Sequence, residues 1–274
     1  MNLSLAFRHP FVRLQIVIYI ALVVFWSWIN VSGLKEGCIN NLYGALYPII
    51  ALLGGLYGVF VVSKKWGGVK SVVGRGLFFL SLGLLAEVFG QWTWSYYTII
   101  KQIEVPYPSI ADIGYFAIIP LYGYAIYNFA IAAGVKVNLR SFQGRLQAIL
   151  IPILMVLIAY FLFLKDVEID SSNLLRTFLD FGYPAFEAIA VSIGILTYSL
   201  SRNVLGGVMK PKVLYLVFAL IVQYVTDYTF LYRAGVGIYY NAGPVDLMYT
   251  TSFMVMSLGI FFFSLNRAEP REEN

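Results

Sequence analysis

The stretch LYPIIALLGGLYGVFVVS, residues 46–63, contains no charged side chain and is long enough to cross a hydrocarbon core as one helix. Further apolar runs of similar length accompany it along the chain. Together the runs cover approximately residues 12–30, 42–63, 75–99, 110–134, 146–165, 176–201, 211–232 and 244–266. The sequence therefore predicts an all-α fold, a polytopic membrane helix bundle with eight transmembrane helices.

The composition of the whole chain agrees with a membrane location. Of the 274 residues, 60% are hydrophobic and only 12% are charged, which is not the composition of an ordinary soluble domain. We therefore expect residues 1–274 to form a single transmembrane domain. The single Cys38 and the single His9 exclude a disulfide framework and the usual zinc and haem ligand sets, so we expect no cofactor and no metal site.

The positive charges lie between the apolar runs and favour alternate loops. The basic positions on one predicted side are Arg8, Arg13, Lys64, Lys65, Lys70, Arg75, Lys136, Arg140, Arg145, Arg202, Lys210 and Lys212. By the positive-inside rule, we expect a cell-membrane protein with both termini in the cytoplasm. This topology in the lipid bilayer explains the net charge of +5, so we expect no nucleic-acid partner.

The two halves of the chain resemble each other. The opening stretch matches GYPAFEAIAVSIGILTYS at 182–199, with Tyr47-Pro48 opposite Tyr183-Pro184. Four crossings return a chain to its starting side, so both halves would have the same orientation in the membrane. We therefore predict a 4+4 parallel internal repeat about an axis along the membrane normal.

The predicted repeats account for nearly the whole chain. Repeat one covers about residues 12–134, and repeat two covers about residues 146–266. A short cytoplasmic tail follows at 267–274. In this alignment Asp112 falls opposite Asp246, and each acid lies at the start of the last helix of its half.

Both of these acids suit a helix N-terminus. With Ser109 as the N-cap, Asp112 is the third helical residue, from which a carboxylate reaches back to free N–H groups in a capping box. With Gly243 as the N-cap, Pro244 takes the first helical position and Asp246 is again third. We expect Ser109, Asp112 and Asp246 to cap helices at the outer rim. A ligand role is the alternative, because both helices would begin at the same external face.

Three further acids lie within the predicted spans, where burying an ionisable group is expensive. Glu87 and Glu187 fall about half-way along their helices, and Asp227 lies in the outer third of its own. Glu87 and Gln91 are four residues apart on one helix face. Gln223 and Asp227 occupy the aligned positions of the other half, with acid and amide exchanged. The repeat would bring the two pairs together near its axis.

Two roles fit these acids. In the first, they are protonated and hydrogen-bond to neighbouring helices, and they serve only to fix the packing. In the second, they line an outward-facing cavity with aromatic side chains, which suits a small cation or a neutral ligand. For this second role the predicted ligand-binding residues are Glu87, Gln91, Glu187, Gln223, Asp227, Trp94 and Tyr228.

Short motifs around the two rim acids resemble a known family. PYPSIADIGYF at 106–116 follows the aromatic WTWSYY at 92–97, and NAGPVDLMY at 241–249 echoes it before the last helix. This pattern resembles the multi-helix membrane sensor region found ahead of GGDEF diguanylate cyclase and histidine kinase domains in bacterial signalling proteins. The matching residues are Pro108, Ser109, Asp112, Tyr115, Gly243, Asp246 and Tyr249.

The resemblance implies a sensor or receptor-like protein that binds a ligand outside and passes a helix movement to the cytoplasm. In that family an output domain follows the last helix, whereas the tail 267–274 is too short to fold, so we expect a separate cytoplasmic signalling partner. The alternative class is a secondary transporter or channel with 4+4 repeats. We do not expect an enzyme, because no His lies within a span to activate a nucleophile.

Overall fold

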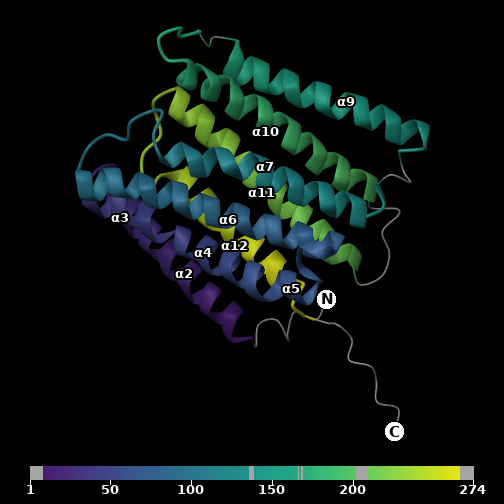
Figure 1. The fold of residues 1–274 in the computed structure, drawn as a ribbon. Coiled ribbons are helices and arrows are strands. Elements are labelled where there is room, and N and C mark those ends of the chain that lie inside the picture. The colour runs from purple at the N-terminus through teal and green to yellow at the C-terminus, as the bar shows by residue number, and fades with distance from the viewer. Residues whose placement is uncertain (1–8, 136–138, 166, 168, 202–208, 266–274) are drawn as a thin grey trace.

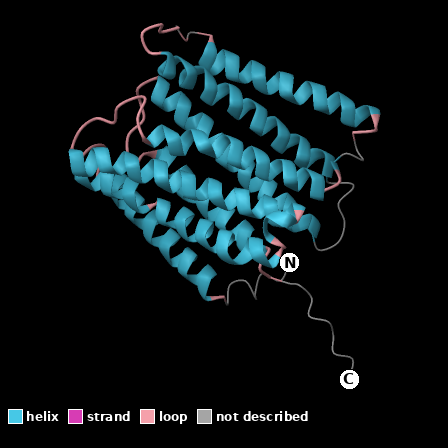
Figure 2. Ribbon diagram, in the orientation of Figure 1, coloured by secondary structure: helices cyan, strands magenta, loops and turns pink. Residues whose placement is uncertain are grey.

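The computed structural model describes residues 9–135, 139–165, 167, 169–201 and 209–265. These residues form helices joined by loops and turns, and they contain no strand (Figures 1 and 2). Among them, 8 helices are long and apolar enough to cross a membrane, as the sequence predicted.

Several of the spans consist of more than one helical segment. The first span is α2 (Pro10–Val31), and the second consists of α3 (Cys38–Leu46), α4 (Pro48–Tyr57), the π-helix η1 (Gly58–Val62) and α5 (Ser63–Lys65). The third span consists of α6 (Val72–Ser95) and the π-helix η3 (Tyr96–Lys101), and the fourth is α7 (Ala111–Ala132). The last four are α9 (Phe142–Ala159) and the π-helix η4 (Tyr160–Leu164); α10 (Leu174–Ser201); α11 (Met209–Gly235); and α12 (Pro244–Phe262). The 3₁₀-helix η2 (Gly68–Lys70) lies between α5 and α6.

The first and last described residues meet at one end of the bundle, which we call the basic end. The His9 ring lies 4.8 Å from the ring of Phe261. Trp66, which follows α5, donates a 2.8 Å hydrogen bond from Nε1 to the carbonyl of Phe263. The described part of the chain therefore begins and ends on one side of the bundle (Figure 1). The tail 267–274 lies outside the described residues.

The opposite end, which we call the cavity end, is tied together by asparagines. Asn40 on α3 donates a 3.0 Å hydrogen bond to the carbonyl of Asn241 in the loop before α12. The Asn241 side chain donates in turn to Asn41 at 2.7 Å. On α2, Asn30 donates to the carbonyl of Ala242 at 3.1 Å. These contacts fix the loop before α12 against the first two spans.

Helices α6 and α7 pack through three glycines of α6, each covered by an aromatic ring of α7. The pairs are Gly76 with Phe129, Gly83 with Tyr122 and Gly90 with Tyr115. Each set recurs every seven residues, about two helical turns, so the contacts lie in register along two antiparallel helices. A Cβ at Gly83 would lie only 2.1 Å from the Tyr122 ring. Glycine therefore permits a close approach that places the α7 rings directly against α6.

Helices α2 and α9 form the periphery of the bundle. In their most apolar windows only 17% of the first span and 11% of the fifth are buried. Both helices carry apolar side chains on the exposed surface, which is the surface expected to face lipid. The centre is formed by α6, α7, α10, α11 and α12, of which α12 is the most buried span, at 67%.

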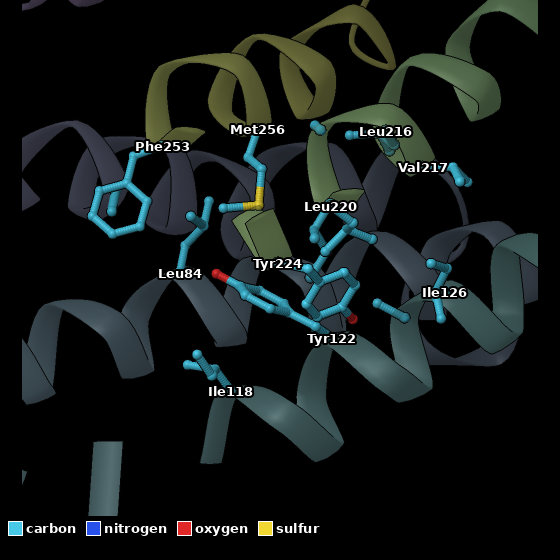
Figure 3. Close-up of a cluster of buried hydrophobic side chains, with 14 of the residues drawn as sticks. Leu84, Ile118, Tyr122, Ile126, Leu216, Val217, Leu220, Tyr224, Phe253 and Met256 are labelled. Atoms are coloured by element: carbon cyan, nitrogen blue, oxygen red, sulfur yellow. The ribbon is translucent and has the colours of Figure 1, made fainter. Parts of the chain in front are cut away.

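Buried hydrophobic side chains of these helices pack in a cluster next to the acids (Figure 3). Leu84 lies about one turn from Glu87 on α6, and Leu220 lies about one turn from Gln223 on α11. Met256 of α12 is fully buried in the same cluster. The other labelled members are Ile118, Tyr122, Ile126, Leu216, Val217, Tyr224 and Phe253. The cluster therefore lies directly beside the acids of α6 and α11.

Candidate ligand-binding cavity

A cavity of about 820 Å³ extends from the cavity end into the centre of the bundle. Its walls come from α6, α7, α10, α11 and α12, and its rim includes Glu104 and Tyr107 of the loop before α7. This volume lies in the range of small-molecule sites. The position, between helices and open at one end, is also one where bundles bind ligands.

Three acids from three different helices line the deep part of this cavity. They are Glu87 of α6, Glu187 of α10 and Asp227 of α11. All three acids are buried, with exposed fractions of 3% for Glu87, 3% for Glu187 and 7% for Asp227. The structure thus brings together three acids that the sequence places up to 140 positions apart.

An amide from α11 connects two of the acids. Gln223 Nε2 donates to Glu87 Oε1 at 2.8 Å and to Asp227 Oδ1 at 3.0 Å. The side-chain oxygen of Gln223, Oε1, accepts a 2.7 Å hydrogen bond from the Ser252 hydroxyl of α12. Tyr249, one turn earlier on α12, donates to Asp227 Oδ1 at 2.9 Å. Gln223 lies behind the wall, and it joins α6, α11 and α12 in one network.

The remaining oxygens of the acids are not all satisfied. Glu187 Oε2 and Asp227 Oδ2 are buried and have no hydrogen-bond partner among the described residues. Arg176 is the one basic side chain among the described residues that line the cavity, and it lies 3.8 Å from Asp180 at the rim. The deep acids therefore have no cationic partner among these lining residues, although burying a carboxylate without one is costly.

Gln91 and Trp94 also line the cavity, one and two turns from Glu87 on α6. Gln91 accepts a 2.8 Å hydrogen bond from the Tyr115 hydroxyl of α7. Trp94 packs edge-on against Tyr239, with ring centroids 6.2 Å apart. Gln91 Nε2 and Trp94 Nε1 are buried and have no partner among the described residues.

Two of the predicted ligand residues, Gln223 and Tyr228, are not among the residues that line the cavity, and Tyr228 packs on another side of α11. Its ring stacks on Phe163 with centroids 5.3 Å apart, and its hydroxyl lies 3.4 Å from the carbonyl of Pro184. The residue follows Asp227 directly, and successive residues on a helix point about 100° apart. Tyr228 therefore joins α11 to α9–η4 and α10.

The rim acid Asp112 reaches back over the start of α7, as predicted. Its Oδ2 accepts the Ser109 amide at 2.7 Å, while its Oδ1 accepts the Tyr183 hydroxyl of α10 at 2.8 Å. The helix begins at Ala111 with Ile110 as its N-cap, one residue later than Ser109 would require. The Ser109 hydroxyl accepts from the Ala111 amide at 3.2 Å, so this residue forms a turn ahead of the helix.

The second rim acid, Asp246, is fully buried and does not line the cavity. Gly243 is the N-cap of α12 and Pro244 is its first residue, as predicted. Asp246 accepts the Ala242 amide at 2.7 Å and the Tyr239 hydroxyl at 3.0 Å. Burial first, and the nearby Asp246 second, raise the pKa of Tyr239 well above its ordinary value.

Two tyrosines beside the acids belong to the motifs described above but are not among the predicted ligand-binding residues. Tyr115 and Tyr249 each follow a rim acid by three residues, so each lies on the same helix face one turn deeper than Asp112 or Asp246. That spacing was visible in both copies of the motif. The hydroxyl partners could not be read, because they lie on other helices.

The described residues include no group of three or more His, Cys, Asp and Glu side chains placed to hold a metal ion. Comparison of the chain with protein-family models, with curated proteins and with solved structures finds no match.

Proposed function

We propose that this protein is a membrane receptor-like module that binds a small organic cation in the cavity and signals to a separate partner. One observation carries the proposal: Glu87, Glu187 and Asp227 converge from three helices on one cavity whose described deep lining contains no basic side chain. A bound cation would supply the missing positive charge and would stabilise the three helices against one another.

The shape and lining of the site favour an organic ligand. A volume of about 820 Å³ is far larger than a desolvated metal ion requires. Apolar and aromatic residues such as Leu179 and Phe230 form much of the wall between the acids and the rim. They would cover the body of a ligand whose charged end meets the acids.

Helix α12 is the candidate for transmitting binding to the basic end. It contacts the acid network through Tyr249 and Ser252. Near its C-terminus, the carbonyls of Phe263 and Leu265 accept hydrogen bonds from Trp66 and from Lys212 of α11. A cation at Asp227 would change the contact with Tyr249, and a shift of α12 would then reach the side where a cytoplasmic partner would bind.

The finer architecture that we propose is the 4+4 parallel repeat. Its support is a pair of like contacts: Tyr115 of α7 donates to Gln91 of α6 at 2.8 Å, and Tyr249 of α12 donates to Asp227 of α11 at 2.9 Å. Helix packing is also alike, since α4 packs against α6 and α12, while α10 packs against α11 and α7. Superposing the halves of an experimental structure tests the repeat, and an axis in the membrane plane would refute it.

A secondary transporter is the second candidate, because a site between two repeats is where such proteins bind substrate. The hydrophobic cluster of Figure 3 packs next to the acids, as it would in a receptor and in the outward-open state of a transporter. Uptake of a radiolabelled amine into proteoliposomes separates the two functions. A receptor binds the amine without accumulating it inside, whereas saturable uptake that depends on Asp227 would establish transport.

The orientation that we propose puts the cavity outside and the basic end in the cytoplasm of a cell-membrane protein. Cys38 is exposed beside the cavity end and is the only cysteine in the chain. A membrane-impermeant maleimide should label it on intact cells. In a Cys38→Ser background, Lys64→Cys should react only after the membrane is opened. The reverse pattern would invert the topology.

The binding proposal is tested with a matched pair of probes on the purified protein. We expect 2-phenylethylammonium to raise the unfolding temperature, and 2-phenylethanol, which lacks the charge, to leave it unchanged. Glu187→Gln and Asp227→Asn should each reduce the shift without eliminating it, because each removes one acid from the cavity and leaves the other two. Glu36→Gln, at an exposed loop position outside the cavity lining, is the matched control and should keep it. Equal shifts in all variants would refute binding at the acids.

A further inference from the structure

We infer that the cation recognised by this cavity carries N–H groups, as a primary ammonium or a guanidinium does, and that the site discriminates against quaternary ammonium ions. The inference rests on the proposed function, since it specifies which class of organic cation the same acids bind. An acid-and-aromatic cavity alone would suit either class, because quaternary ammonium ions bind to aromatic faces and charged amines bind to carboxylates.

The first argument is the set of unsatisfied acceptors. Glu187 Oε2 and Asp227 Oδ2 belong to residues that are 3% and 7% exposed, they line the cavity, and they have no donor among the described residues. A ligand with several N–H groups can donate to both oxygens. A trimethylammonium group has no donor, so it would remove water from these oxygens and leave them unpaired, which is costly in a buried site.

The second argument is the fixed position of Asp227. Its Oδ1 already accepts hydrogen bonds from Gln223 and from Tyr249. Gln223 is itself held by Ser252 at 2.7 Å. These three contacts orient the carboxyl group and leave Oδ2 as the atom available to a donor. The site is therefore preorganised to accept a directional hydrogen bond as well as to attract a charge.

The third argument is the orientation of the aromatic rings. Tyr249 points its hydroxyl at Asp227, and its ring lies nearly parallel to Tyr47 with centroids 6.4 Å apart. Tyr239 points its hydroxyl at Asp246, and Trp94 and Phe230 pack against its ring at 6.2 and 5.0 Å. The hydroxyl groups of Tyr249 and Tyr239 thus point at acids, and their rings pack against other aromatic rings. A cage for a quaternary ammonium ion requires free ring faces around the cation.

A methylation series on one ligand body tests the inference directly. The probes are 2-phenylethylammonium and its N-methyl, N,N-dimethyl and N,N,N-trimethyl derivatives, which share the aromatic body and are all cationic at pH 7. We expect affinity for the detergent-purified, full-length protein, measured by calorimetry, to fall along the series by at least about tenfold overall, roughly one lost charged hydrogen bond. Equal or rising affinity with methylation overturns the inference and leaves the proposed function standing.

Two acid variants locate the discrimination. In Glu187→Gln and Asp227→Asn, the ratio of primary to trimethyl affinities should fall toward one, while Glu36→Gln should keep the wild-type ratio. An unchanged ratio in both acid variants contradicts the assignment to these oxygens. Should the variants fail to fold, the series on the wild-type protein still decides the question. If no member of the series binds to the wild type, the proposed function fails and this inference fails with it.

Discussion

The helix pairs α6–α7 and α11–α12 share one contact and differ in the packing around it. In each pair a tyrosine of the second helix donates a hydrogen bond to a polar side chain of the first. In α6–α7 the acceptor is the neutral amide of Gln91, and three glycines let the helices approach closely. In α11–α12 the acceptor is the carboxyl group of Asp227. One glycine of this pair, Gly259 of α12, lies as close to side chains of the other helix as the three glycines of α6 do.

The difference indicates which pair can respond to a ligand. A contact between helix backbones has few alternative arrangements, because interiors are packed as tightly as crystals. The α6–α7 pair therefore acts as a fixed wall that holds Glu87 and Gln91. The α11–α12 pair depends more on side chains, and its tyrosine contacts the acid that a cation would approach. We expect binding to change α11–α12 and to leave α6–α7 unchanged.

The largest expected effect comes from Gly114 of α7, where the backbones of the α6–α7 pair come closest together. A Cβ at Gly114 of α7 would lie 2.6 Å from the carbonyl oxygen of Ala86 and 2.6 Å from the amide of Gly90. These are backbone atoms, so they cannot rotate away. We expect Gly114→Ala to lower the free energy of unfolding by about 1–3 kcal/mol. Thermal unfolding in detergent measures the loss.

Two further glycines give the controls for this variant. Gly123 lies on the same helix, and a Cβ there would meet no atom within 4 Å, so Gly123→Ala should be neutral or stabilising by up to about 1 kcal/mol. A Cβ at Gly259 of α12 would lie 2.4 Å from a terminal methyl group of Leu216, a side-chain atom that rotation can shift. The loss of stability in Gly259→Ala should therefore fall between those of Gly114→Ala and Gly123→Ala. If Gly259→Ala is the most harmful, α11–α12 is the tighter pair and the comparison is wrong.

A smaller effect separates the two tyrosine contacts. Among the described residues, Tyr249→Phe removes one of the two donors to the Asp227 carboxyl group, and Tyr115→Phe removes the one donor to Gln91 Oε1. Hydrogen bonds to charged groups contribute more than neutral ones, and Gln223 still donates to Asp227 in Tyr249→Phe. We therefore expect losses of about 1.5 kcal/mol for Tyr249→Phe and about 1 kcal/mol for Tyr115→Phe.

The two tyrosine variants should also differ in their response to 2-phenylethylammonium. In Tyr249→Phe the amine can replace a lost donor at Asp227, so its thermal shift should exceed that of the wild type. In Tyr115→Phe no acid has lost a contact, and the shift should stay the same. Identical shifts in both variants would mean that the ligand does not approach Asp227.

The sequence predicted the membrane spans because lipid demands long apolar helices, and that demand is local. It also singled out Glu87, Glu187 and Asp227, since an acid within a span is costly wherever its partners lie. The start of α12 at Pro244 followed from the backbone preferences of Gly243 and Pro244. Each of these predictions depends on residues close together in the chain.

What the sequence could not give depends on contacts between helices. The spacing of Gly76, Gly83 and Gly90 was readable, but not the rings of α7 that cover them. Tyr228 is a predicted ligand residue as one of the aromatic side chains near the acids, and the structure stacks its ring on Phe163, outside the cavity lining. The face of α11 that it occupies decides this contact, and one residue along a helix changes the face by about 100°.

The smallest expected effect concerns pH and the loop before α12. Burial, followed by the charge of Asp246, raises the pKa of Tyr239 in the folded protein above the unfolded-state value of about 10. The folded state then holds the Tyr239 proton more tightly than the unfolded state does. The contribution of this proton to the free energy of unfolding is therefore complete below pH 10 and is lost as pH rises through the folded-state pKa. Between pH 9 and 10.5 the wild type should lose roughly 0.8 kcal/mol through this residue.

Tyr239→Phe has no such proton to lose, so its stability deficit relative to the wild type should narrow by that amount over the same range. Tyr240→Phe is the matched control in the same loop, because its hydroxyl lies 3.4 Å from an amide oxygen of Asn30 and not beside a carboxyl group. This variant removes a tyrosine hydroxyl from the loop and leaves the hydrogen bond between Tyr239 and Asp246 in place. Thermal unfolding at closely spaced pH values measures all three. A constant gap between Tyr239→Phe and the wild type would mean that Tyr239 is open to solvent, and that the loop over α12 is looser than its hydrogen bond to Asp246 implies.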